Sequence, residues 1–265
     1  ALAAAMPPLA GEPLEPPRFE ETGWKVGQVF IEADDPDRAR STWQPPTFAC
    51  KPRSAGRCAE TRAEELQLQP RHQACGSFAR VVRRVLSEKD CADLIRHVNA
   101  KGFTPALVNI GHNRQQLMPD FRDGHRVIVE SRELAGWLLE ALRPHLPDRL
   151  EDGSQLVELN ERLRFLCYTP GQAFESHLDG EYCRPPGHPR AGDRSCITVQ
   201  VYLHDVPDTH GGATTFFPGC AFSVKHQPEV GSVLLFTQDL LHEGSLVRAG
   251  LKYTLRTEVM YATPN

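Results

Sequence analysis

A histidine and an aspartate lie two positions apart in the second half of the chain, at His177 and Asp179. They follow an apolar run, Leu163 to Tyr168, and a Pro170-Gly171 turn. Residues two apart in an extended segment point to the same side, so this imidazole and carboxylate can reach one point. His242 is the candidate for a second imidazole. Two imidazoles and one carboxylate on one side of an Fe(II) ion leave its other positions open.

The spacing of two residues does not by itself identify a site, because a chain with 11 histidines contains such pairs by chance. The order of the motifs that follow is more specific. A Gly211-Gly212-Ala213-Thr214 segment comes first, then an apolar run from Gly231 to Phe236, then His242. Lys252 follows ten residues later, inside a strand-like segment.

Three other histidines follow the pair and compete with His242 for the role of second imidazole. They are His204, His210 and His226. Only His242 has both the preceding glycine-led apolar run and a lysine ten residues beyond it. The motif context therefore favours His242.

This ordered series resembles the 2-oxoglutarate- and Fe(II)-dependent dioxygenases, and among them the prolyl 4-hydroxylase-like group. The resemblance extends from about Leu86 to the C-terminus and departs from the family pattern at Phe217, an extra residue before Pro218. The motifs that carry it are Tyr168-x-x-Gly171, His177-x-Asp179, Gly211-Gly212-x-Thr214, Gly231 to Phe236, and His242 with Lys252.

The resemblance implies an oxidoreductase that uses Fe(II), 2-oxoglutarate and O2. It implies that His177, Asp179 and His242 bind the metal and form the catalytic centre. Succinate and CO2 would be released while a prime substrate, expected to be a protein or peptide side chain, is hydroxylated. Ascorbate binding is a further expectation. The alternative is a cupin-like metal-binding module or a scaffold protein without oxygenase activity.

A buried distal carboxylate of 2-oxoglutarate would require a cation. Lys252 occupies the family's position, and Arg256 lies four residues further on the same side of the strand. The spacing favours Lys252, whereas a guanidinium would offer bidentate binding, so both remain candidates. Tyr168 is expected to bind the same carboxylate through its hydroxyl. Thr254 and Thr198 are expected to face the interior.

The pattern of elements predicts a mostly β fold with flanking helices. Helices are expected from Ser87 to about Gly102 and from Ser131 to Pro144, packed on the outer face of a sheet. Many short β-like runs follow from about Leu156, which is typical of a sandwich or barrel. We expect a double-stranded β-helix, the jelly roll of cupins. The strands predicted are Leu163 to Tyr168, Cys196 to Leu203, Thr214 to Phe217, Phe222 to Val224, Ser232 to Phe236 and Lys252 to Tyr261.

Composition divides the chain into two parts. Residues 1–75 are expected to be a Pro-rich extension, partly extended or strapped to the core with a strand between Trp24 and Ile31. Residues 76–265 are expected to form the dioxygenase domain that the resemblance implies. Residues 103–126 are predicted to be a loop, which the resemblance would place near the mouth of the site and which could equally be a polar connection without a role there. The polar insert 180–194 is predicted to be a lid over the metal.

The net charge, the cysteine spacing and the length of the apolar runs argue against several classes of protein. A net charge of −4 argues against a nucleic-acid partner, and no Cys-x-x-Cys supports a structural zinc. Cys50 and Cys58 would pair only in an oxidising compartment. No apolar run is long enough for a membrane span, and the first residues lack a signal peptide pattern. A cytoplasmic location is expected, or the endoplasmic reticulum if a signal was removed. The oligomeric state is left open.

Overall fold

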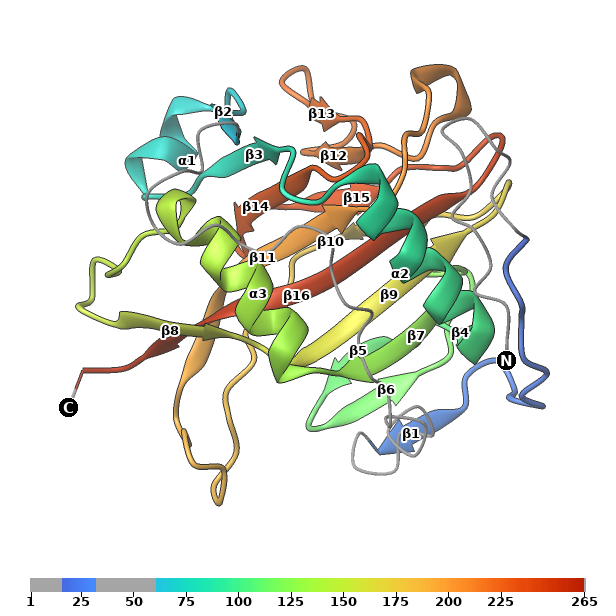
Figure 1. Ribbon diagram of the computed structural model, residues 1–265, viewed down its shortest axis with the longest axis horizontal. Coiled ribbons are helices and arrows are strands. Elements are labelled where there is room, and N and C mark those ends of the chain that lie inside the picture. Colours follow the sequence, from blue (N-terminus) through green and yellow to red (C-terminus); the bar gives the residue numbers. More distant parts are fainter. Residues whose placement is uncertain (1–15, 32–60, 265) are drawn as a thin grey trace, which may run out of the picture.

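The computed structural model describes residues 16–31 and 61–264. Within them the chain forms a large antiparallel sheet, a smaller sheet packed against it and a three-stranded sheet at one end (Figure 1). The possible Cys50–Cys58 pair lies outside the described residues, as does much of the predicted N-terminal extension. None of the described helices combines the length and the hydropathy needed to span a bilayer.

The large sheet runs in the order β2-β3-β14-β11-β16-β9-β7-β4, and β8 also pairs with β16. Its strands are β2 (Arg62–Glu65), β3 (Ala79–Arg83), β4 (Thr104–Pro105), β7 (His125–Glu130), β8 (Gln155–Leu159), β9 (Arg162–Tyr168), β11 (Arg194–Tyr202), β14 (Val233–Thr237) and β16 (Lys252–Ala262).

The smaller sheet runs in the order β10-β15-β12-β13, and the third in the order β1-β6-β5. The smaller sheet consists of β10 (Phe174–His177), β12 (Thr214–Phe216), β13 (Val224–His226) and β15 (His242–Gly244). The third consists of β1 (Val29–Ile31), β5 (Val108–Gly111) and β6 (Arg114–Gln116). The two facing sheets confirm the predicted jelly roll.

Two helices cover the outer face of the large sheet, as predicted: α2 (Glu88–Lys101) and α3 (Arg132–Leu142) (Figure 1). The hydroxyl of Ser87 accepts a hydrogen bond from the Asp90 amide and begins α2, and Gly102 ends it. The apolar faces of both helices are buried in one core cluster together with alternate residues of the sheet. The helices contribute the residues Cys91, Leu94, Ile95, Val98, Leu134, Leu138 and Leu142 to this cluster. A short helix, α1 (Pro70–Ala74), lies ahead of β3.

The two faces of strand β16 have different roles, since one faces the helix-covered core and the other faces the candidate site. Its odd-numbered residues Tyr253 and Leu255 join the helix-covered core. Its even-numbered residues, from Lys252 to Glu258, line a cavity on the opposite face. The period of two in a strand produces this division. Between the sheets, Tyr202, Phe216 and Phe236 belong to a second apolar cluster that holds the smaller sheet in place.

Residues 103–126 are not the loop that we predicted. They contain β4 and the hairpin β5–β6, whose turn places His112 and Asn113 at φ of 53° and 55°. His and Asn tolerate this left-handed conformation better than most residues. The polar residues of this region obscure the alternation of apolar and polar residues that would have predicted the two flanking strands.

The described parts of residues 1–75 join existing sheets. β1 pairs with β6 over three residues, and β2 pairs with β3 over four. Strand structure within the predicted stretch Trp24 to Ile31 is restricted to Val29–Ile31. Val29 and Ile31 are both exposed, so the strand is held by backbone pairing rather than by burial.

Candidate active site

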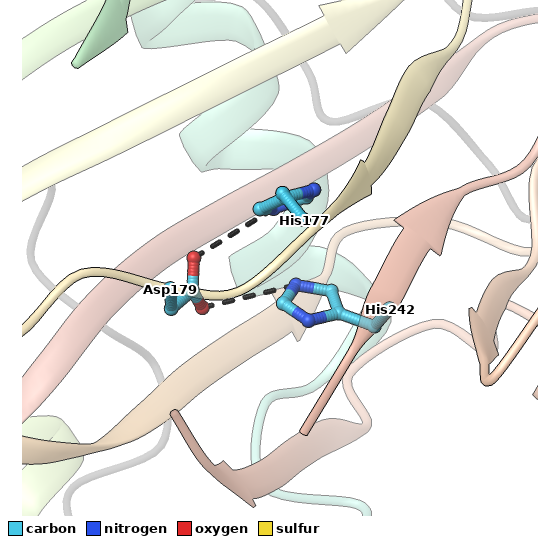
Figure 2. A group of neighbouring side chains, drawn as sticks. All are labelled: His177, Asp179 and His242. Atoms are coloured by element: carbon cyan, nitrogen blue, oxygen red, sulfur yellow. Dashed lines mark ion pairs between the residues drawn. The ribbon is translucent and has the colours of Figure 1, made fainter. Parts of the chain in front are cut away.

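Pairing between two short strands brings the candidate imidazoles together. His177 ends β10 and His242 begins β15, and the antiparallel register sets the two residues opposite one another. Asp179 follows two residues after His177. Figure 2 shows the three side chains converging: Asp179 Oδ1 lies 3.7 Å from His177 Nε2, and Asp179 Oδ2 lies 3.8 Å from His242 Nε2. One ligand atom from each lies within 4.8 Å of the others, which fits a single metal ion.

Backbone carbonyls fix the tautomer of both imidazoles. His177 Nδ1 donates to the Glu175 carbonyl at 2.7 Å, and His242 Nδ1 donates to the Leu240 carbonyl at 2.9 Å. A carbonyl oxygen can only accept, so the proton resides on Nδ1 in each ring. The Nε2 lone pairs are therefore free to face a metal, in the arrangement typical of metal-bound histidine.

The protonation states suit a metal centre at neutral pH. Burial, with His242 nearby, lowers the pKa of His177 to about 3. Burial also lowers the pKa of His242. Burial alone would raise the pKa of Asp179, but Arg256 and the two imidazoles hold this pKa below its ordinary value. Metal binding requires neutral imidazoles and an ionised carboxylate, and these three groups meet that requirement.

Both oxygens of Asp179 have partners that orient the carboxylate. Thr198 donates its hydroxyl to Oδ2 at 2.5 Å, and Arg256 Nη2 lies 2.8 Å from Oδ1. Thr198 thus faces the interior, as predicted. Arg256 was a candidate for the 2-oxoglutarate anchor, but its guanidinium is engaged with this carboxylate.

The pair Asp179–Arg256 continues as a buried chain of alternating charges. Arg256 Nη1 and Arg164 Nη1 both donate to Glu258 Oε1 at 2.8 Å. Asn160 Nδ2 donates to Glu258 Oε2 at 3.1 Å. The structure thus pairs Arg164 with Glu258. Sequence reasoning missed the contact between Arg256 and Asp179, since their proximity depends on the loop after β10.

Lys252 lies on the same cavity with a different environment. It is 3 % exposed, and within the described part of the chain it forms no ion pair with a carboxylate. Burial lowers its pKa to about 8. Tyr168 is its partner across β16 and β9, with the Lys252 ammonium 5.7 Å from the centroid of the Tyr168 ring. Thr254 is buried on the same wall.

The side chains line one cavity of about 660 Å³ between the sheets. Its wall includes Leu107 to Gly111 from the β5–β6 hairpin region and Gly180 to Tyr182 from the start of the predicted lid. Arg184, further along that segment, is bound by Glu158 and Glu161 at 2.6 Å. This ionic contact fixes the segment beside the cavity.

The competing histidines His204, His210 and His226 do not line the cavity. His204 Nε2 accepts from the Tyr253 amide at 3.2 Å, and the buried His226 packs against Tyr202. Among the cavity-lining residues that the structure describes, the histidines are His177 and His242. The extra residue Phe217 adopts φ of 52° and is buried, and Phe216 still pairs with His242. The insertion therefore leaves the site unshifted.

Comparison with known proteins gives a family match over part of the chain. Residues 163–257 match the model of the 2OG-Fe(II) oxygenase superfamily. No curated protein sequence matches the chain. Enzymes of this superfamily need Fe(II), 2-oxoglutarate and O2, and the matched range contains every candidate site residue from Tyr168 to Arg256.

Solved structures resemble the fold at low sequence identity. A Trichoplax adhaerens prolyl hydroxylase, in complex with a hypoxia inducible factor oxygen degradation domain peptide fragment, aligns with a TM-score of 0.53 and 17 % identity over 69 % of this chain and 83 % of that one. The viral collagen prolyl hydroxylase of Paramecium Bursaria Chlorella virus-1 aligns with a TM-score of 0.49 and 19 % identity, over 72 % of this chain and 98 % of that one. A Pseudomonas putida prolyl-4-hydroxylase aligns with a TM-score of 0.48 and 18 % identity, over 71 % and 93 %. The chain therefore has a prolyl hydroxylase-like fold, and its residues 163–257 are similar to the 2OG-Fe(II) oxygenase superfamily, which supports a 2-oxoglutarate-dependent dioxygenase.

Proposed function

We propose that the chain hydroxylates a protein or peptide side chain, as a prolyl hydroxylase does, with release of succinate and CO2. The observation that carries this proposal is a buried cation, Lys252, on the same cavity as the converging pair of histidines and Asp179. Likeness of fold to a prolyl hydroxylase in complex with a peptide supports the choice of a peptide substrate.

In this proposal His177, Asp179 and His242 hold Fe(II), which supplies the oxygen-activating chemistry when bound. Neighbouring groups orient these three ligands. Arg256 and Thr198 keep the carboxylate of Asp179 turned toward the two Nε2 atoms. The backbone carbonyls of Glu175 and Leu240 hold the two rings in the required tautomer.

Lys252 anchors the distal carboxylate of 2-oxoglutarate in this account. Arg256 was the alternative anchor, but its charge is already matched by Asp179 and Glu258. Lys252 has no acidic partner in the described residues, and a buried ammonium without a counter-ion is costly. Tyr168 lies opposite it and is proposed to contact the same carboxylate. A metal-binding module without a cosubstrate would leave this buried lysine without a role.

The test is hydroxylation of peptides by the Fe(II)-loaded enzyme. Proline-containing peptides are incubated with 2-oxoglutarate and O2, and mass spectrometry measures the gain of one oxygen while succinate is quantified. We expect succinate and hydroxylated peptide in equal amounts, and neither with His177→Ala. Failure to hydroxylate any member of a broad peptide panel would remove the peptide substrate from the proposal. Succinate release by His177→Ala at the wild-type rate would contradict the assigned metal site.

A further inference from the structure

A cation on the cavity wall, Arg122, stands close to the candidate metal site. It lies between β6 and β7, and a backbone bridge pairs it with Phe174 of β10. Its guanidinium carbon is 4.5 Å from the centroid of the Phe174 ring. That ring stacks on His177 with 3.7 Å between the ring centroids. Arg122 is therefore fixed beside the imidazole, one aromatic ring away.

The charge of Arg122 is matched by no carboxylate among the described residues. Nη1 donates to the Leu107 carbonyl at 3.3 Å, and Nε is buried without a hydrogen-bond partner in the described part of the chain. The neighbouring carboxylate of Asp123 is used elsewhere, since its Oδ1 accepts from the Ala173 amide at 2.7 Å. A buried N–H group without a hydrogen-bond partner lowers the stability of the fold. We therefore expect the Arg122 guanidinium to bind an anion that the protein itself does not supply.

The other cations of the wall are already engaged. Two of these cations share one carboxylate, two others each contact one polar or acidic side chain, and the fifth is the lysine that the proposed function assigns to 2-oxoglutarate. They are Arg164 and Arg256 with Glu258, Arg126 with Gln115, Arg162 with Glu130, and Lys252. The anion that Arg122 takes is therefore separate from 2-oxoglutarate and belongs to the other reactant.

We propose that Arg122 binds a carboxylate of the prime substrate, so that the enzyme selects peptides with an acidic group next to the side chain it oxidises. The inference rests on the proposed function. A guanidinium held over an aromatic ring can present two parallel N–H groups to a carboxylate. That carboxylate comes either from an Asp or Glu side chain beside the target residue or from the free C-terminus of the peptide.

Binding measured without turnover tests this directly. The enzyme is loaded with Fe(II) and 2-oxoglutarate under argon, and three matched proline peptides are titrated by calorimetry. One carries Glu beside proline and an amidated C-terminus, one carries Gln with the amide, and one carries Gln with a free C-terminus. The variants are Arg122→Gln and Arg122→Lys. Arg132→Gln is the matched control, because Arg132 is exposed on α3 at the opposite face of the sheet.

We expect one of the two carboxylate-bearing peptides to bind about ten- to hundredfold more tightly than the neutral one. Which one does so identifies the source of the carboxylate. Arg122→Gln abolishes this preference, Arg122→Lys keeps part of it, and Arg132→Gln keeps all of it. The KM for 2-oxoglutarate stays unchanged in Arg122→Gln.

Equal binding of the three peptides, or a preference that survives Arg122→Gln, overturns the inference. A raised KM for 2-oxoglutarate with unchanged peptide binding also overturns it, because Arg122 would then serve the cosubstrate. Turnover is scored separately by mass spectrometry. A preference for acidic peptides without any gain of oxygen refutes peptide hydroxylation and leaves the role of Arg122 in binding intact. Hydroxylation of the peptides without a binding preference supports peptide hydroxylation and refutes the role of Arg122 in binding.

Discussion

Replacement of Lys252 by methionine tests whether this buried ammonium is kept for the cosubstrate at the expense of stability. Methionine retains the apolar stem and removes the charge. Burial lowers the lysine pKa from 10.5 to about 8. One pKa unit corresponds to about 1.4 kcal/mol, so the charged lysine costs the metal-free fold roughly 3 kcal/mol near neutral pH. We therefore expect Lys252→Met to raise the free energy of unfolding by up to about that amount.

The pH dependence of this gain has a definite sign. Between about pH 8 and pH 10.5 the unfolded chain binds the lysine proton and the folded chain does not. The contribution of Lys252 to wild-type stability therefore rises with pH through this window, and below it the cost is fully present. The advantage of Lys252→Met should shrink across the window and vanish above it. Denaturant unfolding of both metal-free proteins at a series of pH values measures this difference.

The same substitution should weaken binding of 2-oxoglutarate. Removal of one partner from a buried ion pair costs about 3–5 kcal/mol, which corresponds to about a hundredfold to several thousandfold in affinity. Succinate release against 2-oxoglutarate concentration gives the KM. Lys225→Met is the control, because Lys225 is exposed on β13 and should alter neither quantity. An unchanged KM in Lys252→Met, or a less stable metal-free fold, would refute the reasoning.

Three further predictions follow from the surroundings of the site. Arg256→Gln frees one oxygen of Asp179 and should weaken metal affinity by about 10- to 100-fold in calorimetry; unaltered affinity would show that Thr198 orients the carboxylate alone. Gly124→Ala should raise the KM for 2-oxoglutarate without changing metal affinity, because a Cβ there would lie 2.4 Å from the Tyr168 ring; an unchanged KM would separate Tyr168 from cosubstrate binding. Ser87→Ala removes the cap of α2 and should lower the free energy of unfolding by about 1 kcal/mol with metal affinity retained; loss of metal would mean that the helix contributes to the site.

Long strands and capped helices were predictable because local pattern determines them. The alternation in β16 put Lys252 and Arg256 on one face, and the structure agrees. The Ser87 cap and the Gly102 end of α2 were also visible in sequence. Such features depend on neighbours within a few residues, which a single sequence contains.

Features that depend on distant pairing were not predictable. β10 and β15 are four and three residues long and each contains an acid, exposed in β10 and half-buried in β15, so neither has a strand pattern. Their register decides that His177 lies opposite His242, and no local signal contains that information. The engagement of Arg256 by Asp179 likewise depends on a loop conformation. The unmatched charge of Arg122 emerges only when the cavity wall is complete.

The central claim is that one Fe(II) ion is held by His177, Asp179 and His242 with 2-oxoglutarate anchored at Lys252. Anomalous diffraction at the iron edge, from crystals grown under argon with Fe(II) and 2-oxoglutarate, tests it most directly. The account predicts one iron peak in contact with Nε2 of both histidines and a carboxylate oxygen of Asp179. It also predicts the distal carboxylate of 2-oxoglutarate at the Lys252 ammonium. An iron peak elsewhere, or a cosubstrate carboxylate bound away from Lys252, would contradict it.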